Sequence, residues 1–322
     1  ETDKAQQLAQ KARDLAPIEP HTADTLGWIL YKKRQFSRAL ILLQEAAEKL
    51  PDSPEVQFHV GMANYVMGQE QAARSALKKA LDAGVDFNGI DEARRSSSLL
   101  DIDPATADAD AVKRLEAAIA ERPDDPVALT RMAGIHERAG NTGQAIAALE
   151  SALRTNEKNV PVLTSLARLH AANKNAAKAL EMAKAARKLA PDDSAIAHTL
   201  GRMAYQVGDY SWSASLLQEA VRRGSSSPDL LLDLAETLYS VGRVSEAENA
   251  LRGALQAGGL FLRAGEARQL LEWIALAGNP AEAVTQASRV EEALKSDPAL
   301  VPALMASGAI SEQRNDAAKA RS

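Results

Sequence analysis

The chain has 322 residues, with 38 Lys and Arg against 43 Asp and Glu, and a formal net charge of −5. This balance lacks the basic excess typical of nucleic-acid-binding proteins, so no nucleic-acid partner is predicted. The absence of cysteine excludes thiol catalysis, Cys-ligated metals and disulfides. Hydrophobic residues make up 46% of the chain and aromatic residues only 4%, which predicts a core of Ala and Leu. No apolar run reaches the roughly 18 residues of a membrane span, so no direct membrane insertion is expected.

Small residues recur along the chain at a spacing of 34 residues. They occupy the same place in each interval: Gly27 and Gly61, then, in a second register, Ala133, Ala167, Gly201 and Ala235. Each interval holds two stretches with apolar residues at helical spacing, separated by a turn that usually contains Gly. A single helical hairpin of this length cannot bury both of its faces, so the hairpins must stack on one another. The sequence therefore predicts an all-α solenoid of antiparallel helix pairs, with about 18 helices and no strand.

The predicted elements follow the 34-residue spacing and its two interruptions. In chain order they are 1–17, the second helix of a truncated repeat; 18–84, two regular repeats; 85–125, an irregular repeat; 126–259, four regular repeats; 260–297, a second irregular repeat; and 298–322, a partial repeat. The irregular repeats lie where the spacing between small residues grows to 38 and 39. Because the chain begins with Glu1 and neither end has a clear polar capping helix, we expect it to be part of a longer protein.

The residues between Ala23 and Pro51 resemble the tetratricopeptide repeat (TPR) signature. The matching positions are Ala23, Leu26, Gly27, Phe36, Ala39, Leu40, Ala46 and Pro51. Residues 54–84 and 126–259 resemble it nearly as well, while Arg34 and Lys174 depart from it where the turn between helices normally has Gly. The resemblance implies a right-handed superhelix in which the first helix of each repeat lines a concave groove. It also implies a non-catalytic scaffold that binds a partner protein or an extended peptide there.

Catalytic and metal-binding patterns are not evident. The sequence has no phosphate-binding loop, no dinucleotide-binding glycine motif, no GxSxG and no HExxH. His136 and His170 occupy equivalent places in adjacent repeats, which fits either a metal pair or, preferably, packing between helices. The acidic segment 101–110 lacks the Gly and Glu of a calcium loop, so Asp108 is better explained as a helix cap. We therefore predict no catalytic residue, no cofactor and no metal.

The candidate partner-binding residues lie on the first helices of the repeats. In the first two repeats they form an aromatic corner: Asp24, Trp28, Tyr31, Phe58, Met62 and Tyr65. A more polar surface follows in the later repeats: His198, Arg202 and Tyr205, with Leu232, Glu236 and Tyr239 beyond them. Large aromatic residues and Met are typical of interface hot spots. The alternative is that Tyr31, Phe58 and Tyr65 pack between repeats.

The resemblance leaves several functional alternatives open. Chaperone-binding members of the family hold a C-terminal carboxylate with Lys and Asn on the first helices of successive repeats. Asp24 and Trp28 stand at equivalent places here, so a chaperone adaptor is not expected. The Ala-rich helices resemble those of large bacterial TPR proteins of exopolysaccharide export and exosortase systems. This resemblance favours the periplasm or cell envelope over the cytoplasm.

The alternative function is a substrate-presenting region of a larger enzyme such as a glycosyltransferase. Asn64 is the single first-helix asparagine of the regular repeats, so the asparagine ladder of that class is absent. Self-association through exposed end repeats is a further alternative.

Overall fold

The computed structural model describes residues 2–224, 226–257, 261–296, 298 and 300–314. Within these ranges it contains nineteen helices and no strand, so the predicted all-α fold is confirmed. The predicted boundary at residues 259 and 260 and the last part of the partial repeat, residues 315–322, lie outside the described residues. The chain divides into two compact units, residues 1–190 and 191–322, which we call unit 1 and unit 2.

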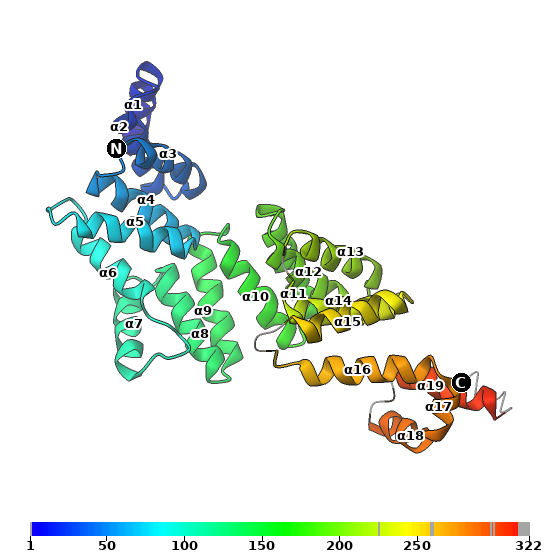
Figure 1. Cartoon of the computed structure of the whole chain (residues 1–322). Coiled ribbons are helices and arrows are strands. Elements are labelled where there is room, and N and C mark those ends of the chain that lie inside the picture. Colours follow the sequence, from blue (N-terminus) through cyan, green and yellow to red (C-terminus); the bar gives the residue numbers. More distant parts are fainter. Residues whose placement is uncertain (1, 225, 258–260, 297, 299, 315–322) are drawn as a thin grey trace. The chain divides into compact units, whose positions relative to one another are not determined.

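Unit 1 consists of successive helical hairpins interrupted by one irregular segment (Figure 1). After α1 (Thr2–Leu15), its antiparallel pairs are α2 (Pro20–Lys32) with α3 (Phe36–Lys49), α4 (Pro54–Met67) with α5 (Glu70–Asp82), α8 (Pro126–Arg138) with α9 (Thr142–Thr155), and α10 (Val160–Ala172) with α11 (Ala176–Leu189). The irregular segment holds α6 (Ile90–Leu100), which packs on α5, and α7 (Ala109–Glu121), which packs on α8.

Unit 2 continues the hairpin pattern and then departs from it. Its regular pairs are α12 (Ser194–Gln206) with α13 (Tyr210–Arg222) and α14 (Pro228–Ser240) with α15 (Val244–Gln256). They are followed by α16 (Ala264–Ala277), α17 (Pro280–Thr285), α18 (Ala287–Ser296) and α19 (Val301–Gln313). Because residues 280–296 form two helices, the described part of the chain has one helix more than the approximate number predicted.

The mid-helix glycines allow the two helices of a hairpin to approach closely. A Cβ atom on Gly27 would lie 2.8 Å from Leu43 Cγ, and one on Gly201 would lie 2.7 Å from Leu217 Cγ. Both leucines are completely buried. The 34-residue spacing of small residues is therefore a packing requirement, because a larger side chain there would overfill the core.

The turns between paired helices use a left-handed residue even where the sequence lacks Gly. Arg34 and Lys174 have φ angles of 59° and 58°, close to the 79° of Gly242 at the equivalent place. The N–H of Gln35 donates to the carbonyl of Leu30 at 2.9 Å, which closes the end of α2. The departures from the TPR signature at these two positions therefore leave the turn geometry unchanged.

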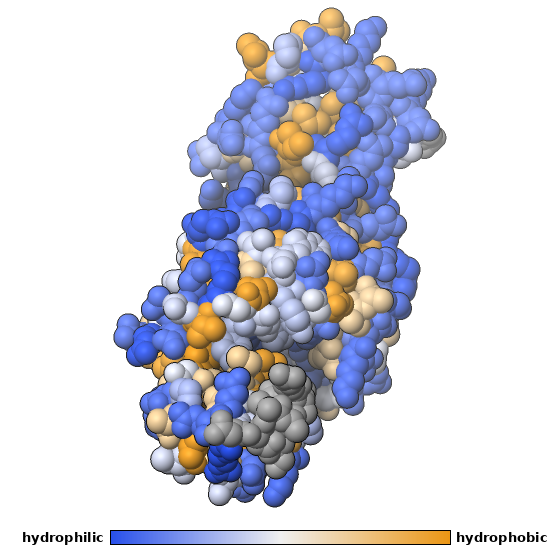
Figure 2. All heavy atoms as spheres, turned by 90° about the vertical axis from the view of Figure 1, so that its right-hand side faces the viewer, coloured by the Kyte–Doolittle hydropathy of each residue, from blue (hydrophilic) through white to orange (hydrophobic). Residues whose placement is uncertain are grey.

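The buried interior is composed mainly of Ala and Leu, as the composition predicts. These small and flexible side chains fill the space between closely spaced helices. The face of the molecule drawn in Figure 2 is largely hydrophilic, with hydrophobic residues in scattered patches.

The irregular segment of unit 1 brings helices from distant repeats together. The hydroxyl of Tyr65 on α4 donates to Asp125 Oδ1 at 2.8 Å, and Asp125 also caps α8. The Nδ2 atoms of Asn156 and Asn159 both donate to the carbonyl of Val66 at 3.2 Å. The end of α4 is therefore covered by residues that lie 60 to 93 positions further along the chain.

Candidate functional site

Three members of the predicted aromatic corner lie in the core of unit 1. Phe58, Met62 and Tyr65 are only 1–2% exposed. The ring of Phe58 packs against Gly89 at the start of α6 and tilts against Phe87 at a ring-centroid distance of 5.7 Å. The irregular segment and α8 largely enclose these three side chains, as in the packing alternative, although Met62 and Tyr65 also line a cavity of about 200 Å³. Their role in partner binding stays a prediction.

The other three members of the aromatic corner interact with neighbouring side chains of unit 1. Asp24 Oδ1 forms a hydrogen bond with His59 Nδ1 at 2.9 Å. Trp28 stacks on His59 at a centroid distance of 4.1 Å and on Tyr31 at 4.6 Å. The ammonium group of Lys32 lies 4.5 Å from the centroid of the Trp28 ring. Trp28 and Tyr31 remain partly exposed, so this surface is a packed cluster with a small accessible edge.

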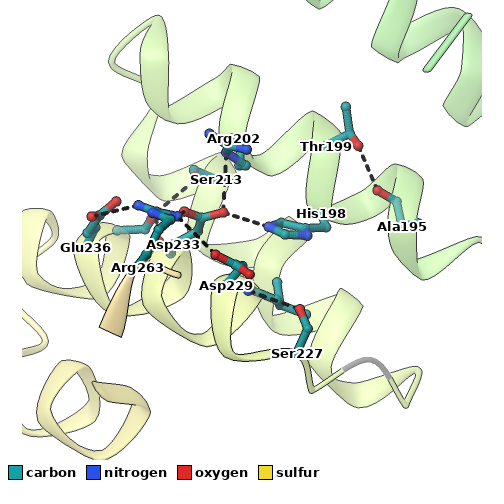
Figure 3. A network of polar contacts seen from close by, with 12 residues as sticks. Ala195, His198, Thr199, Arg202, Ser213, Ser227, Asp229, Asp233, Glu236 and Arg263 are labelled. Carbon is teal, nitrogen blue, oxygen red and sulfur yellow. Dashed lines mark hydrogen bonds and ion pairs between the residues drawn. The ribbon is translucent and has the colours of Figure 1, made fainter. Parts of the chain in front are cut away.

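The second predicted surface, in unit 2, is organised around the buried carboxylate of Asp233 on α14. His198 Nε2 lies 2.7 Å from Asp233 Oδ2, and Arg202 Nε lies 3.3 Å from the same oxygen. Arg263, directly before α16, donates through Nη1 to Asp233 Oδ1 at 2.7 Å. Figure 3 shows these side chains converging from three successive segments of unit 2. Two of the predicted residues, His198 and Arg202, thus belong to one network.

Three further carboxylates extend the network through Arg263. Its Nε donates to Glu266 Oε2 at 2.8 Å, and its Nη2 lies 3.4 Å from Glu236 Oε1. The Asp229 carboxylate lies 4.0 Å from Nη1 of the same guanidinium. Four carboxylates therefore share the two guanidinium groups of Arg202 and Arg263, which leaves an excess of negative charge around the network.

Burial and ion pairing have different net effects on the pKa values of the two most buried carboxyls of the network, Asp233 and Glu236. Burial alone would raise the pKa of Asp233, but hydrogen bonds from His198 and Arg263 hold this pKa below its ordinary value. For Glu236, burial is the largest effect and raises the pKa above its ordinary value in spite of the nearby Arg263. The charge on Asp233 is thus well compensated in the folded chain, whereas the charge on Glu236 is not.

Two adjoining cavities lie beside the network and share Tyr205 and Glu236. The smaller one, of about 200 Å³, is lined by Arg202, Tyr205, Gln206, Leu217, Asp233, Glu236, Thr237 and Arg263. The larger one, of about 470 Å³, is lined by Tyr205, Glu236, Tyr239, Ser240, Glu266, Gln269, Leu270, Trp273, Ala293, Ser296, Leu300, Val301 and Pro302. We call the two cavities together the α12–α14–α16 groove, after the helices that contribute most of its walls. Tyr205, the third residue predicted in this unit, forms part of it.

The sequence prediction omitted Asp233, Arg263 and Glu266. A signal for Asp233 was available, because contacts between successive first helices recur at a separation of 35 residues. Asp24 with His59, His198 with Asp233, and Tyr205 with Ser240 all have this separation. Arg263 and Glu266 lie where the 34-residue spacing fails, so no periodic signal indicates them.

The alternatives that involve metals gain no support from the described residues. No group of three or more His, Cys, Asp or Glu side chains with the geometry of a metal site occurs among them. Asp108 accepts a hydrogen bond from the N–H of Ala111 at 2.8 Å at the start of α7, so its predicted capping role is confirmed. Of the helices described, none is long and apolar enough to cross a membrane.

Family models for the tetratricopeptide repeat match more than half of the sequence. One model matches residues 25–85, 109–160 and 198–260, and a second matches 137–203. The chain belongs to the tetratricopeptide repeat family. TPR repeats suggest a scaffold for protein–protein interaction, and TPR proteins are generally non-catalytic.

Other comparisons with known proteins are more distant. The TPR chain is similar to the crystal structure of MamA, with 12% identity, a TM-score of 0.42, and coverage of 53% of this chain and 95% of that one. It is also similar to a Pseudomonas aeruginosa pilF structure, with 14% identity, a TM-score of 0.41, and coverage of 81% and 98%. No curated protein matches the sequence significantly. The narrower resemblance to exopolysaccharide-export and exosortase-linked TPR proteins stays a prediction, as does an envelope location.

Proposed function

We propose that this TPR chain is a non-catalytic scaffold that binds an extended segment of a partner protein in the α12–α14–α16 groove of unit 2. The observation that carries the proposal is the larger cavity of this groove, of about 470 Å³, which combines aromatic and aliphatic walls with polar groups. Binding sites for ligands commonly have this size and mixture. TPR repeats as a family suggest protein binding, which agrees with this use of the groove.

The arrangement of the lining residues favours an extended ligand. Tyr205 comes from α12, Tyr239 from α14 and Leu270 from α16, so a segment that crosses the groove would contact several successive helices. Tyrosines are enriched at protein interfaces because they bury a large ring and keep a polar hydroxyl available. In unit 1, by contrast, the candidate residues Phe58, Met62 and Tyr65 belong to the buried core and have little surface to offer a ligand.

A selection of short random peptides against the full chain tests this proposal. Peptides that bind the wild-type chain are expected to lose at least about tenfold in affinity with Tyr239→Ala or Leu270→Ala, because hot-spot side chains typically contribute about 2 kcal/mol or more. Val244→Ala on α15 is the matched control, since Val244 is exposed and lines neither cavity. Fluorescence anisotropy of labelled peptides measures the dissociation constants.

Two results would contradict the proposed function. One is a selection that yields no binding peptide. The other is a set of peptides whose affinity stays the same in Tyr239→Ala and Leu270→Ala, because the binding surface would then lie elsewhere on the chain. Far-ultraviolet circular dichroism of each variant verifies that its helices are retained.

A further inference from the structure

We propose that the segment bound in the α12–α14–α16 groove presents a lysine or arginine side chain to Glu236 and Glu266. This inference rests on the proposed function, since it specifies the chemistry of the partner at the same groove. The occupant is a segment of a partner protein with a basic residue flanked by apolar ones.

The larger cavity has acidic walls. Glu236 and Glu266 are the only charged residues among its described lining residues, and both are acidic. Both carboxylates contact the same guanidinium of Arg263, so they face a common region next to the cavity. A cationic side chain that entered there would be attracted by both carboxylates, and more strongly by Glu236, which is two-thirds buried, than by Glu266, which is 60% exposed.

Glu236 is the carboxylate of this pair that the cations already present compensate least. Arg263 reaches Asp233 at 2.7 Å and Glu266 at 2.8 Å but Glu236 only at 3.4 Å, and Arg202 binds Asp233. Glu236 is two-thirds buried, with 32% of its side chain exposed. Its raised pKa agrees with the geometry, because burial is the largest influence on that carboxyl. A partner's ammonium or guanidinium group would supply the compensation that the free chain lacks.

The remaining walls of the larger cavity are mainly aromatic and aliphatic. Tyr205, Tyr239 and Leu270 are partly buried and provide apolar surface for the aliphatic stem of a long basic side chain. Trp273, which is 3% exposed, also lines the cavity, and its indole N–H has no hydrogen-bond partner among the described residues. The guanidinium of Arg289 already lies 5.0 Å from the centroid of the Trp273 ring, so the rings left to attract a cation beside the carboxylates are those of Tyr205 and Tyr239.

The test starts from the peptides selected on the full chain, with their single basic residue replaced by Gln or by Glu. The basic peptide is expected to bind about tenfold more tightly than its Gln version, which corresponds to one charge-assisted contact of about 1.4 kcal/mol. That preference is expected to fall to less than about threefold in Glu236→Gln. Glu246→Gln on α15 is the control, because it removes the same charge from unit 2 outside both cavities and is expected to leave the preference unchanged.

A charge exchange tests direct contact. In Glu236→Lys, the peptide with Glu in place of its basic residue is expected to bind more tightly than the basic peptide, which reverses the wild-type order. Spermine serves as a competitor, and it is expected to weaken the basic peptide without affecting the Gln version.

The outcomes separate this inference from the proposed function. Peptides that require Tyr239 but show no preference for a basic residue, or whose preference survives in Glu236→Gln, would overturn the inference and leave the proposed function intact. Spermine binding that depends on Glu236 while peptides bind elsewhere would also overturn it, because the occupant would then be a small polycation. Failure to select any peptide would overturn both proposals.

Discussion

Replacing Asp233 by Ala is expected to lower the free energy of unfolding of unit 2 by about 2–3 kcal/mol, because it removes a buried carboxylate that holds two charge-assisted contacts to partly buried partners. Asp233 is 7% exposed, and its two oxygens bind His198 and Arg263 at 2.7 Å each. Urea unfolding in a Trp28→Phe background measures this effect, since the remaining tryptophans, Trp212 and Trp273, both lie in unit 2.

Glu236→Gln is the matched control for Asp233→Ala. Because burial raises the pKa of Glu236, removing its charge is expected to leave the stability of unit 2 at pH 7 unchanged or slightly higher. A loss of less than about 1 kcal/mol in Asp233→Ala would contradict the account of the network, because that is the size expected of an exposed ion pair.

The two carboxyls also give unit 2 an expected dependence on pH. Since the folded-state pKa of Asp233 is lowered, its contribution to stability is present above the ordinary carboxyl pKa of about 3.9 and is lost as the pH falls through the folded-state value. Glu236 has a raised pKa and therefore favours the folded state at low pH, where it is protonated. Between about pH 4 and pH 3, Asp233→Asn is expected to lose less stability than the wild type does.

The second large effect is expected in unit 1, where Phe58→Ala should lower the free energy of unfolding by about 3–5 kcal/mol. The Phe58 side chain is 1% exposed and joins α4 to the start of α6 through its contacts with Gly89 and Phe87. Its removal is expected to open this junction, so urea-dependent hydrogen exchange should accelerate in α4 and α6 together.

Ile41→Ala is the control for Phe58→Ala, because Ile41 lies in the same unit and is 67% exposed. It is expected to change the stability of unit 1 by less than about 0.5 kcal/mol. If Phe58→Ala behaved like Ile41→Ala, the ring would be a surface group available to a partner. That result would contradict the burial of Phe58 between α4 and α6.

The regular part of the fold could be predicted from the sequence because its packing rule is local and periodic. Gly27 and Gly201 must be small to admit Leu43 and Leu217, so each hairpin leaves a mark at the same place in its interval. The break between α17 and α18 left no such mark, because no Gly or Pro lies between Ala281 and Ser296. A break without a helix-breaking residue depends on tertiary packing, which periodicity does not report.

The candidate site could be predicted only in part. Helical periodicity placed Phe58 and Tyr65 on the first-helix face. It could not show that Gly89, directly before α6, and Asp125, directly before α8, cover that face. In unit 2 the prediction included His198 and Arg202 but omitted Asp233, the carboxylate that joins them. The sequence thus predicts which residues share a helix face. It does not predict which residues of neighbouring repeats cover or connect those faces.

The most direct test of the account is hydrogen exchange of the full chain with and without a peptide obtained by the selection. We expect the bound peptide to slow exchange in α12, α14 and the first half of α16, because the proposed groove is lined by these helices. Protection confined to α2 and α4, with unit 2 unchanged, would contradict the account and return the binding surface to the aromatic corner of unit 1.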